Sequence, residues 1–238
     1  MQYRNGQRLP LDGGLTLRLS VNPRARRLSV RIDHKAGEAV AVAPSERRLD
    51  QAVDFAVSRK TWIAERLAER PAGQAFAPGG AILLNGVETP LLAAGGAGAA
   101  RITSVEGRPA IVSGGEGEAY ARRVERLLRA EARKALTDRT DVHLRSLGLK
   151  PVRLSIGDPK SRWGSCSPHN RSIRYSWRVI MAPPEVLDYL AAHEVAHLVH
   201  ADHSPAYWSV VERLVGDHRP FRRWLREHGA ALHAAGRR

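Results

Sequence analysis

The segment His193-Glu194-Val195-Ala196-His197 constrains the fold of this chain more than any other stretch of the sequence. Two histidines four residues apart lie on the same face of a helix, about one turn apart, so both rings can reach one ion. Zinc accepts neutral imidazole at about 2.0–2.1 Å and prefers four ligands. Glu194 follows the first histidine directly, where it can hold a water rather than the metal. The segment therefore predicts a helix with His193 and His197 as zinc ligands and Glu194 as a catalytic carboxylate.

A third histidine, His203, follows His197 after six residues. On an unbroken helix it would lie about 240° around the axis from His197 and could not share its ion. However, Ser204-Pro205 matches an N-cap residue followed by proline at the first helical position, so one helix should end shortly after His197 and another begin here. His203 then lies in the corner between two helices and is the predicted third ligand. Three protein ligands with an open fourth position are typical of catalytic zinc.

Several neighbouring residues offer alternatives. His200 would lie about 300° on from His197 around a helix, still near the metal-facing side, and Glu212 on the next helix is a second alternative ligand. Cys166 is either a fourth ligand in a latent state, because thiolate binds zinc well, or a structural thiol. Trp163 either lines a substrate cleft or anchors its loop as a buried aromatic residue.

The composition limits the class and compartment of the protein. A chain of 238 residues can bury a sizeable core in one domain or two, and 43% hydrophobic with 26% charged residues is ordinary for a soluble protein. The single cysteine excludes an internal disulfide framework and fits a reducing compartment. The N-terminus lacks an apolar signal-peptide core, and no run approaches 18 apolar residues. We therefore expect a cytoplasmic protein without a membrane partner.

The formal net charge of +14 raises the hypothesis of nucleic-acid binding. Arginine makes up 33 of the 38 basic residues, and these arginines are scattered along an alanine-rich chain. That bias resembles coding composition as much as selection for phosphate, and net charge alone speaks only to non-specific association. Nucleic acid is therefore kept as an alternative partner, and the sequence does not indicate an oligomeric state.

Alternating and helical hydrophobic patterns predict an α+β fold. In the first part they predict strands at 15–21, 28–32 and 39–43, a helix capped by Ser45 that ends at Pro71, a linker at 71–80, and short strands at 81–92 and 101–112 around a glycine-rich hairpin loop at 93–98. In the second part they predict a long helix at 118–147, a strand at 152–156, a polar loop at 160–167, a strand at 172–179 and a helix opened by Pro183-Pro184.

We expect three regions: N-terminal strands plus a helix at 1–75, a β-hairpin region at 76–117 and a catalytic region at 118–238. The three could equally fold as one compact domain.

Several motifs together resemble the YgjP-like metallopeptidase family, which is related more distantly to the SprT-like and WLM peptidases. They are Arg162-Trp163-Gly164-Ser165-Cys166-Ser167, Trp177-Arg178, Ala182-Pro183-Pro184-Glu185, the segment from His193 to His197, and His203-Ser204-Pro205. The resemblance is specific across roughly residues 150–230 and weaker before them. Val195 departs from the pattern, in which leucine is common.

The resemblance implies a zincin-like catalytic domain, with a small mixed sheet whose edge strand faces the substrate cleft and an active-site helix behind it, plus an N-terminal β-rich/α portion. It implies that His193, His197 and His203 bind zinc and that Glu194 is the catalytic carboxylate. The SprT-like relatives act on proteins attached to DNA, but kinship of fold does not fix a substrate.

The predicted reaction is hydrolysis of a peptide or protein substrate. Zinc lowers the pKa of its water towards about 7, and Glu194 accepts the proton and later delivers it to the leaving amine. A further donor to the oxyanion is expected from among Tyr207, His200, Arg162 and His218. The strand at 172–179 is expected to pair a free edge with an extended substrate. The alternatives are a DNA-associated basic protein with a structural or regulatory zinc site and a zinc amidase acting on a non-protein substrate.

Overall fold

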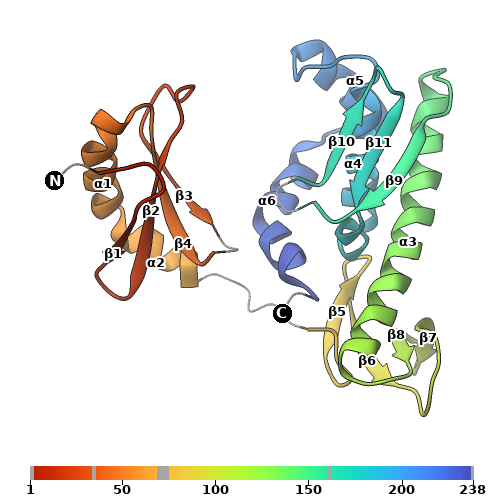
Figure 1. The fold of residues 1–238 in the computed structure, drawn as a ribbon. Coiled ribbons are helices and arrows are strands. Elements are labelled where there is room, and N and C mark those ends of the chain that lie inside the picture. The colour runs from red at the N-terminus through yellow and green to blue at the C-terminus, as the bar shows by residue number, and fades with distance from the viewer. Residues whose placement is uncertain (1–2, 34–35, 69–74, 160–161, 237–238) are drawn as a thin grey trace. The chain divides into compact units, whose positions relative to one another are not determined.

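The structure is a computed structural model that describes residues 3–33, 36–68, 75–159 and 162–236 (Figure 1). The architecture is α+β, and the chain divides into two compact units, Met1–Pro71 and Ala72–Arg238. The regions at 76–117 and 118–238, separated in the sequence analysis, therefore belong to one unit. Parts of the predicted linker and of the predicted polar loop, residues 71–74 and 160–161, lie outside the described residues.

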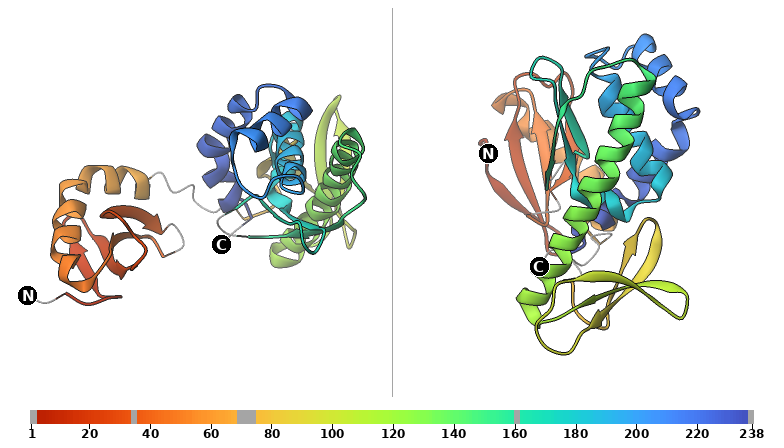
Figure 2. Two further views of the ribbon diagram at one scale, coloured as in Figure 1. Left: turned by 90° about the horizontal axis from the view of Figure 1, so that it is seen from above. Right: turned by 90° about the vertical axis from the view of Figure 1, so that its right-hand side faces the viewer.

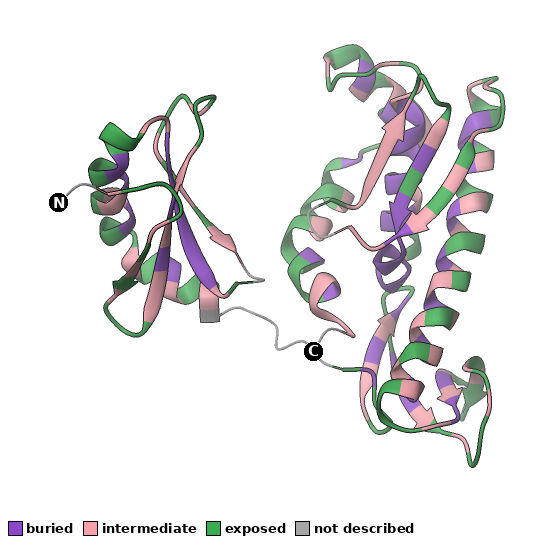
Figure 3. Ribbon diagram, in the orientation of Figure 1, coloured by how far each residue is buried: buried purple, intermediate pink, exposed green. Residues whose placement is uncertain are grey.

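The N-terminal unit is a four-stranded sheet with two helices packed against it. Its elements are β1 (Arg8–Leu11), β2 (Leu15–Val21), β3 (Ser29–Asp33), β4 (Glu38–Ala43), the 3₁₀ helix η1 (Glu46–Arg48), α1 (Leu49–Ser58) and α2 (Lys60–Ala68). The strand order is β1-β2-β4-β3, with β2 and β4 parallel and the other pairs antiparallel. The central strand β4 is buried along its whole length (Figure 3), so the core of this unit lies between β4 and the helices.

The helix predicted from Ser45 to Pro71 is interrupted. Ser58 ends α1, and its hydroxyl donates to the carbonyl of Phe55 at 2.8 Å. A serine that bonds back to the preceding turn competes with continuation of the helix. Ser45 occupies an N-cap position, but its side chain makes no capping hydrogen bond. Ala56 before the break and Ile63 after it are both fully buried, so the break lets both helices face the sheet.

The N-terminal unit also buries one carboxylate, that of Glu38 at the start of β4. The Nε atoms of Arg8 and Arg18 lie 2.7 and 2.6 Å from its two oxygens. The hydrogen bond from Arg8 is the main reason that the pKa of Glu38 is lowered from its ordinary value. This buried charge is therefore fully compensated by cations.

The C-terminal unit contains two small sheets. The first consists of β5 (Ala81–Leu84), β6 (Val87–Ala93), β7 (Arg101–Val105) and β8 (Arg108–Ser113), in the order β5-β6-β8-β7. Each strand predicted here is split by a tight turn, at Asn85-Gly86 and Glu106-Gly107, where all four residues have positive φ. Two-residue hairpins require this conformation. The predicted hairpin loop at 93–98 is wrong, because it joins β6 to β7, and β8 lies between them.

The second sheet consists of β9 (Arg153–Gly157), β10 (Gly164–Ser167) and β11 (Ser172–Ser176), in the order β10-β11-β9. β11 pairs antiparallel with β10 and parallel with β9. The prediction that the strand at 172–179 has a free edge is wrong, because both of its edges are paired, and residues Trp177–Met181 form the 3₁₀ helix η2. The outer strands of this sheet are β9 and β10, and β10 lies within the predicted polar loop.

Four helices complete the unit: α3 (Gly117–Ser146), α4 (Pro184–Ala196), α5 (Pro205–Val215) and α6 (Arg219–Ala234). α3 packs against α4, η2 and β9, and α4 contacts β10 (Figures 1 and 2). Tyr120 and Leu128 of α3 share one apolar core with Ile111 of the first sheet and Tyr175 of the second. Within the described residues, no helix combines the length and apolar character needed to cross a lipid bilayer.

A buried arginine ties the end of α6 to the second sheet. Arg178 is 2% exposed, and its guanidinium donates to both carboxylate oxygens of Asp158, at 2.6 and 3.2 Å. The same group donates to the carbonyls of Leu232, at 3.0 Å, and Ala235. It also lies over the ring of Trp177, 4.4 Å from the centroid. These contacts compensate for the lost hydration of the cation and hold α6 beside the sheet.

Candidate metal centre

The chain forms a helical corner after the first two histidines. α4 is opened by Pro183 and Pro184, and His197 is its C-cap residue. The next turn is tight, since the N–H groups of Leu198 and Val199 bond to carbonyls three residues back. Ser204 then caps α5, with its hydroxyl accepting from the N–H of Tyr207 at 3.4 Å. The helix end and the helix start predicted from the sequence are confirmed.

This corner brings His193, His197 and His203 together, with one potential ligand atom of each lying within 4.8 Å of the others. The Nε2 atoms of His193 and His203 are 3.4 Å apart. A tetrahedral ion with nitrogen ligands at about 2.0–2.1 Å separates those nitrogens by about 3.4 Å. The spacing therefore fits a metal ion, and it is the one cluster of this kind in the described part of the chain.

Outer contacts orient two of the three rings. The Nδ1 of His197 lies 3.2 Å from the carbonyl oxygen of His200, and the Nδ1 of His193 lies 3.4 Å from the hydroxyl of Tyr189. Tyr207 is fully buried beneath the cluster and donates to the carbonyl of His193 at 2.9 Å. Such contacts to the second ring nitrogen fix the tautomer and direct the other nitrogen to a metal.

Burial favours the neutral form of two imidazoles of the cluster, those of His193 and His197. It lowers the pKa of His193 to about 3, with smaller contributions from the neighbouring His197 and His203. The pKa of His197 is also lowered, again mainly by burial. Neutral imidazole is the form that coordinates metal ions, so this environment favours a metal over protons.

Glu194 is buried, with 4% of its surface exposed. Burial raises the pKa of its carboxyl to about 8, and the positive charge of Arg162 opposes the rise. The carboxyl packs directly on the backbone of β10, because a Cβ atom added to Gly164 would overlap it, reaching 2.7 Å from its Cδ. A residue without a side chain is therefore required at position 164.

A cleft of about 340 Å³ opens beside His193 and Glu194. Its walls come from β10, α4 and α6, and they contain Arg162, Trp163, Gly164, Tyr189, Leu190, Arg222, Leu225 and Arg226. Trp163 lines this cleft and also stacks on His233, with ring centroids 4.3 Å apart. Both sequence interpretations of Trp163 therefore apply to the same ring.

The alternative ligands lie outside the histidine cluster. His200 contributes its carbonyl to His197, and the carboxylate of Glu212 lies 3.7 Å from the Nδ1 of His218. Cys166 is half-buried, and burial raises the pKa of its thiol to about 11. The thiol is therefore protonated near neutral pH, which does not favour a nucleophile or a ligand.

Of the four candidate oxyanion donors, Arg162 is the one that lines the cleft. Tyr207 is bonded beneath the cluster, and His218 is buried in a stack on Trp208, with centroids 4.4 Å apart. The sequence analysis assigned no role in a cleft to Gly164, Arg222 or Arg226, all of which line it. The i, i+4 spacing of the two arginines was a usable signal, whereas the contact between Gly164 and Glu194 joins residues thirty positions apart.

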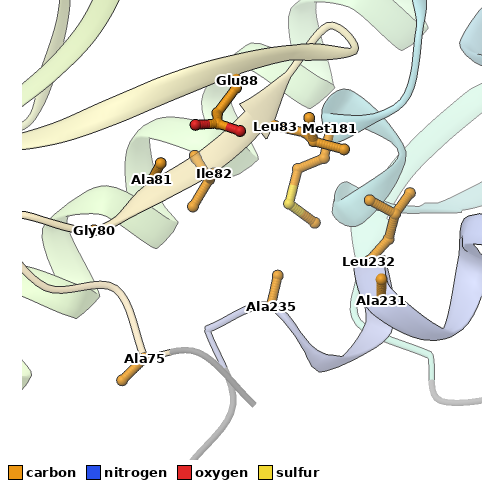
Figure 4. Close-up of a pocket in the computed structure, with 10 residues that line it drawn as sticks. All are labelled: Ala75, Gly80, Ala81, Ile82, Leu83, Glu88, Met181, Ala231, Leu232 and Ala235. Carbon is orange, nitrogen blue, oxygen red and sulfur yellow. The ribbon is translucent and has the colours of Figure 1, made fainter. Parts of the chain in front are cut away.

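A second cavity, of about 380 Å³, lies between β5, η2 and α6 (Figure 4). Its lining is largely apolar, with Ile82, Leu83, Met181 and Leu232, and Glu88 is its one charged residue. Its lining contains neither histidine nor cysteine, so this cavity does not offer a second set of metal ligands like the histidine cluster.

Two solved structures similar to this chain are metallopeptidase zymogens. Abylysin of Pyrococcus abyssi is 23% identical over 39% of this chain and 93% of its own, with a TM-score of 0.36. Jannalysin of Methanocaldococcus jannaschii is 17% identical over 39% of this chain and 94% of its own, also with a TM-score of 0.36. No curated protein matches the chain. The family model described as "YgjP-like, metallopeptidase domain" matches residues 26–228, which include every residue of the histidine cluster and its cleft. The chain belongs to the YgjP-like metallopeptidase family.

Proposed function

We propose that this metallopeptidase is a zinc enzyme in which His193, His197 and His203 hold the ion and Glu194 is the general base. The observation that carries the proposal is the histidine cluster, whose Nε2–Nε2 distance of 3.4 Å matches a tetrahedral zinc site. A buried carboxyl follows the first ligand directly, as a hydrolytic site needs.

His193, His197 and His203 would hold the zinc ion, which would supply a water with a pKa lowered to about 7 and polarise a substrate carbonyl. Glu194 would accept a proton from that water and deliver it to the leaving amine. The pKa of Glu194, about 8 without metal, suits proton transfer in both directions near neutral pH. A bound cation would bring this pKa closer to 7. Arg162, whose side chain reaches the same cleft, can donate to the developing oxyanion.

An extended peptide is the substrate form that the fold favours. The unpaired edge of β10 offers backbone donors and acceptors to an added strand, and Gly164 of that strand lines the cleft. Backbone pairing gives affinity with little sequence preference. A cytoplasmic location, nucleic-acid binding and amidase activity on a non-protein substrate stay predictions.

The test combines metal analysis of the purified protein with digestion of an unstructured protein such as casein. Glu194→Gln should keep its zinc and lose about 10²–10⁴-fold in kcat, the usual contribution of a general base. His203→Ala should lose zinc, whereas the exposed control His169→Ala should retain both zinc and activity. Undiminished cleavage by Glu194→Gln would refute the catalytic role, and full zinc content in His203→Ala would refute the ligand set.

A further inference from the structure

Three arginines converge on the cleft beside the histidine cluster. Arg222 and Arg226 are one turn apart on α6, so both extend from the same face of the helix. Arg162 comes from another segment, two residues before the start of β10. All three line the cleft that also contains His193 and Glu194. We call these three residues the arginine subsite.

The arginine subsite has no anionic partner of its own. Among the described residues, none of its three guanidinium groups forms an ion pair with a carboxylate, and all three side chains are exposed. Glu194 is the single acidic residue in the lining. Elsewhere in the molecule, arginines that serve the fold are paired, as Arg18 is with Glu38 and Arg178 with Asp158. Like charges held close together are destabilising unless an anion joins them.

The position of one subsite arginine is fixed in advance. The guanidinium carbon of Arg222 lies 5.2 Å from the centroid of the Trp208 ring, in a cation–π contact. Trp208 in turn stacks on the buried His218. A charged side chain held in this way loses less freedom when it binds a ligand.

We propose that the arginine subsite binds a carboxylate of the substrate next to the bond that is cut, so that the enzyme prefers peptides with negative charge there. This inference rests on the proposed peptidase function. Arginine presents paired N–H donors that match a carboxylate in bidentate geometry. The carboxylate is either that of an Asp or Glu side chain or the free C-terminus of a short peptide.

The size of the cleft supports a single residue as the occupant. Its volume of about 340 Å³ is at the small end of the range of about 300–1,000 Å³ seen for ligand pockets. Leu190 and Leu225 supply apolar surface beside the arginines, which suits the methylene groups of an acidic side chain. Because His193 and Glu194 line the same cleft, the bound carboxylate lies within one or two residues of the reacting carbonyl.

The test uses matched peptides that differ only in charge near the cleaved bond. Zinc-loaded wild type should cleave a peptide with Glu at a flanking position at least about tenfold faster, in kcat/KM, than the same peptide with Gln. The double variant Arg222→Gln/Arg226→Gln should abolish this ratio, and Arg222→Lys/Arg226→Lys should restore part of it. Arg223→Gln, an exposed arginine of the same helix outside the cleft, should leave it unchanged.

The two sources of the carboxylate are separated by a second peptide set. Peptides with all-neutral side chains are compared with a free and an amidated C-terminus. Loss of cleavage on amidation assigns the arginine subsite to the terminal carboxylate, whereas a Glu-to-Gln effect that survives amidation assigns it to a side chain. Equal rates for every charged and neutral pair would overturn the inference while leaving the peptidase function intact.

A binding measurement keeps the inference testable without turnover. Fluorescence anisotropy of labelled Glu and Gln peptides on zinc-loaded Glu194→Gln should show about tenfold tighter binding of the Glu peptide, weakening with salt. If the proposed function is wrong, wild type will not cleave the peptides, although the Glu peptide will still bind more tightly than the Gln peptide. Equal affinities that the arginine variants do not alter would reject the arginine subsite by itself.

Discussion

The two units of this protein each bury a glutamate, and the two carboxyls behave in opposite ways. Glu38 and Glu194 are equally inaccessible, 3% and 4% exposed. Two arginines bond to Glu38 and lower its pKa, with the hydrogen bond from Arg8 as the largest cause. Glu194 receives no hydrogen bond within the described residues, and burial raises its pKa to about 8. Pairing dominates at one site and desolvation at the other.

This difference agrees with the catalytic role proposed for Glu194 and with a structural role for Glu38. A paired carboxylate stays ionised at any ordinary pH and strengthens the fold only through its partners. An unpaired buried carboxyl changes protonation near neutral pH, which a proton-transfer catalyst requires. Among the described residues, Glu38 is the one buried charged side chain of the N-terminal unit, whereas the C-terminal unit buries Arg178 as well as Glu194.

Among substitutions outside the proposed catalytic and ligand residues, the largest effect is expected from filling the space in which the Glu194 carboxyl lies. Gly164→Ala adds a Cβ that overlaps the carboxyl of Glu194 and displaces it from its position against β10. A shift of about 1 Å in a catalytic group can cost about 10²-fold in rate. We expect kcat to fall by about that factor with zinc content unchanged. Gly95→Ala, at a position with open space around it, is the control and should have wild-type kcat.

The pH dependence of stability should show the unpaired carboxyl directly in metal-free protein. The pKa of Glu194 is raised from an ordinary 4.5 to about 8, so folding takes up a proton in that window and stability falls as the pH rises. His193, whose pKa is lowered from 6.5, weakens the fold only below pH 6.5. Between pH 6.5 and 8 the free energy of unfolding should therefore fall by about 2 kcal/mol, at 1.36 kcal/mol per pH unit.

The measurement is denaturant unfolding in a chelator, followed by the fluorescence of the C-terminal unit's tryptophans. Glu194→Gln should remove most of the slope between pH 6.5 and 8, because it replaces the carboxyl whose pKa in the folded protein is raised to about 8. A wild-type protein with constant stability across that interval would contradict the assignment of a raised pKa.

Substitution of the paired carboxyl, Glu38, should lower stability without affecting the metal site. Glu38→Gln removes the anion that holds Arg8 and Arg18, so the N-terminal unit should melt a few degrees lower. Zinc content should not change, since the histidine cluster lies in the other unit. Scanning calorimetry combined with metal analysis checks both outcomes, and a rise in melting temperature would show that the ion pairs do not support the fold.

The smallest effect is expected at Cys166. The thiol lies outside the histidine cluster, and burial raises its pKa to about 11. Cys166→Ser should leave zinc content and kcat within about twofold of wild type, the scatter expected away from a site. Loss of zinc in this variant would instead support the fourth-ligand interpretation.

The metal cluster could be predicted from the sequence because its information is local. The four-residue spacing of His193 and His197 and the Ser204-Pro205 helix start lie within thirteen residues and fix the corner by themselves. The arrangement of the strands depends on distant pairings. An extended pattern at 172–176 indicates a strand, but does not say that β9 and β10 take both of its edges.

The cleft could not be predicted for the same reason. Its walls bring together residues of β10, α4 and α6, which lie up to about sixty positions apart in the sequence. Gly164 carries no sign of the carboxyl that it accommodates, and the charges of Arg222 and Arg226 look like those of any solvated helix face. The turn at Asn85-Gly86 is different, because an Asn-Gly pair by itself indicates a two-residue hairpin. This turn could have been predicted from the sequence.

The buried guanidinium of Arg178 has a consequence for how the chain can be shortened or tagged. Two of its acceptors are main-chain oxygens in the last turn of α6 and just past it, at Leu232 and Ala235. Trimming the polypeptide back before Leu232 removes both carbonyl acceptors and leaves the guanidinium with Asp158 and the Trp177 ring, at a cost typical of buried donors without acceptors. The helix freed in this way is the one that carries Arg222 and Arg226. Peptide selectivity should therefore decline before catalysis itself as the tail is removed.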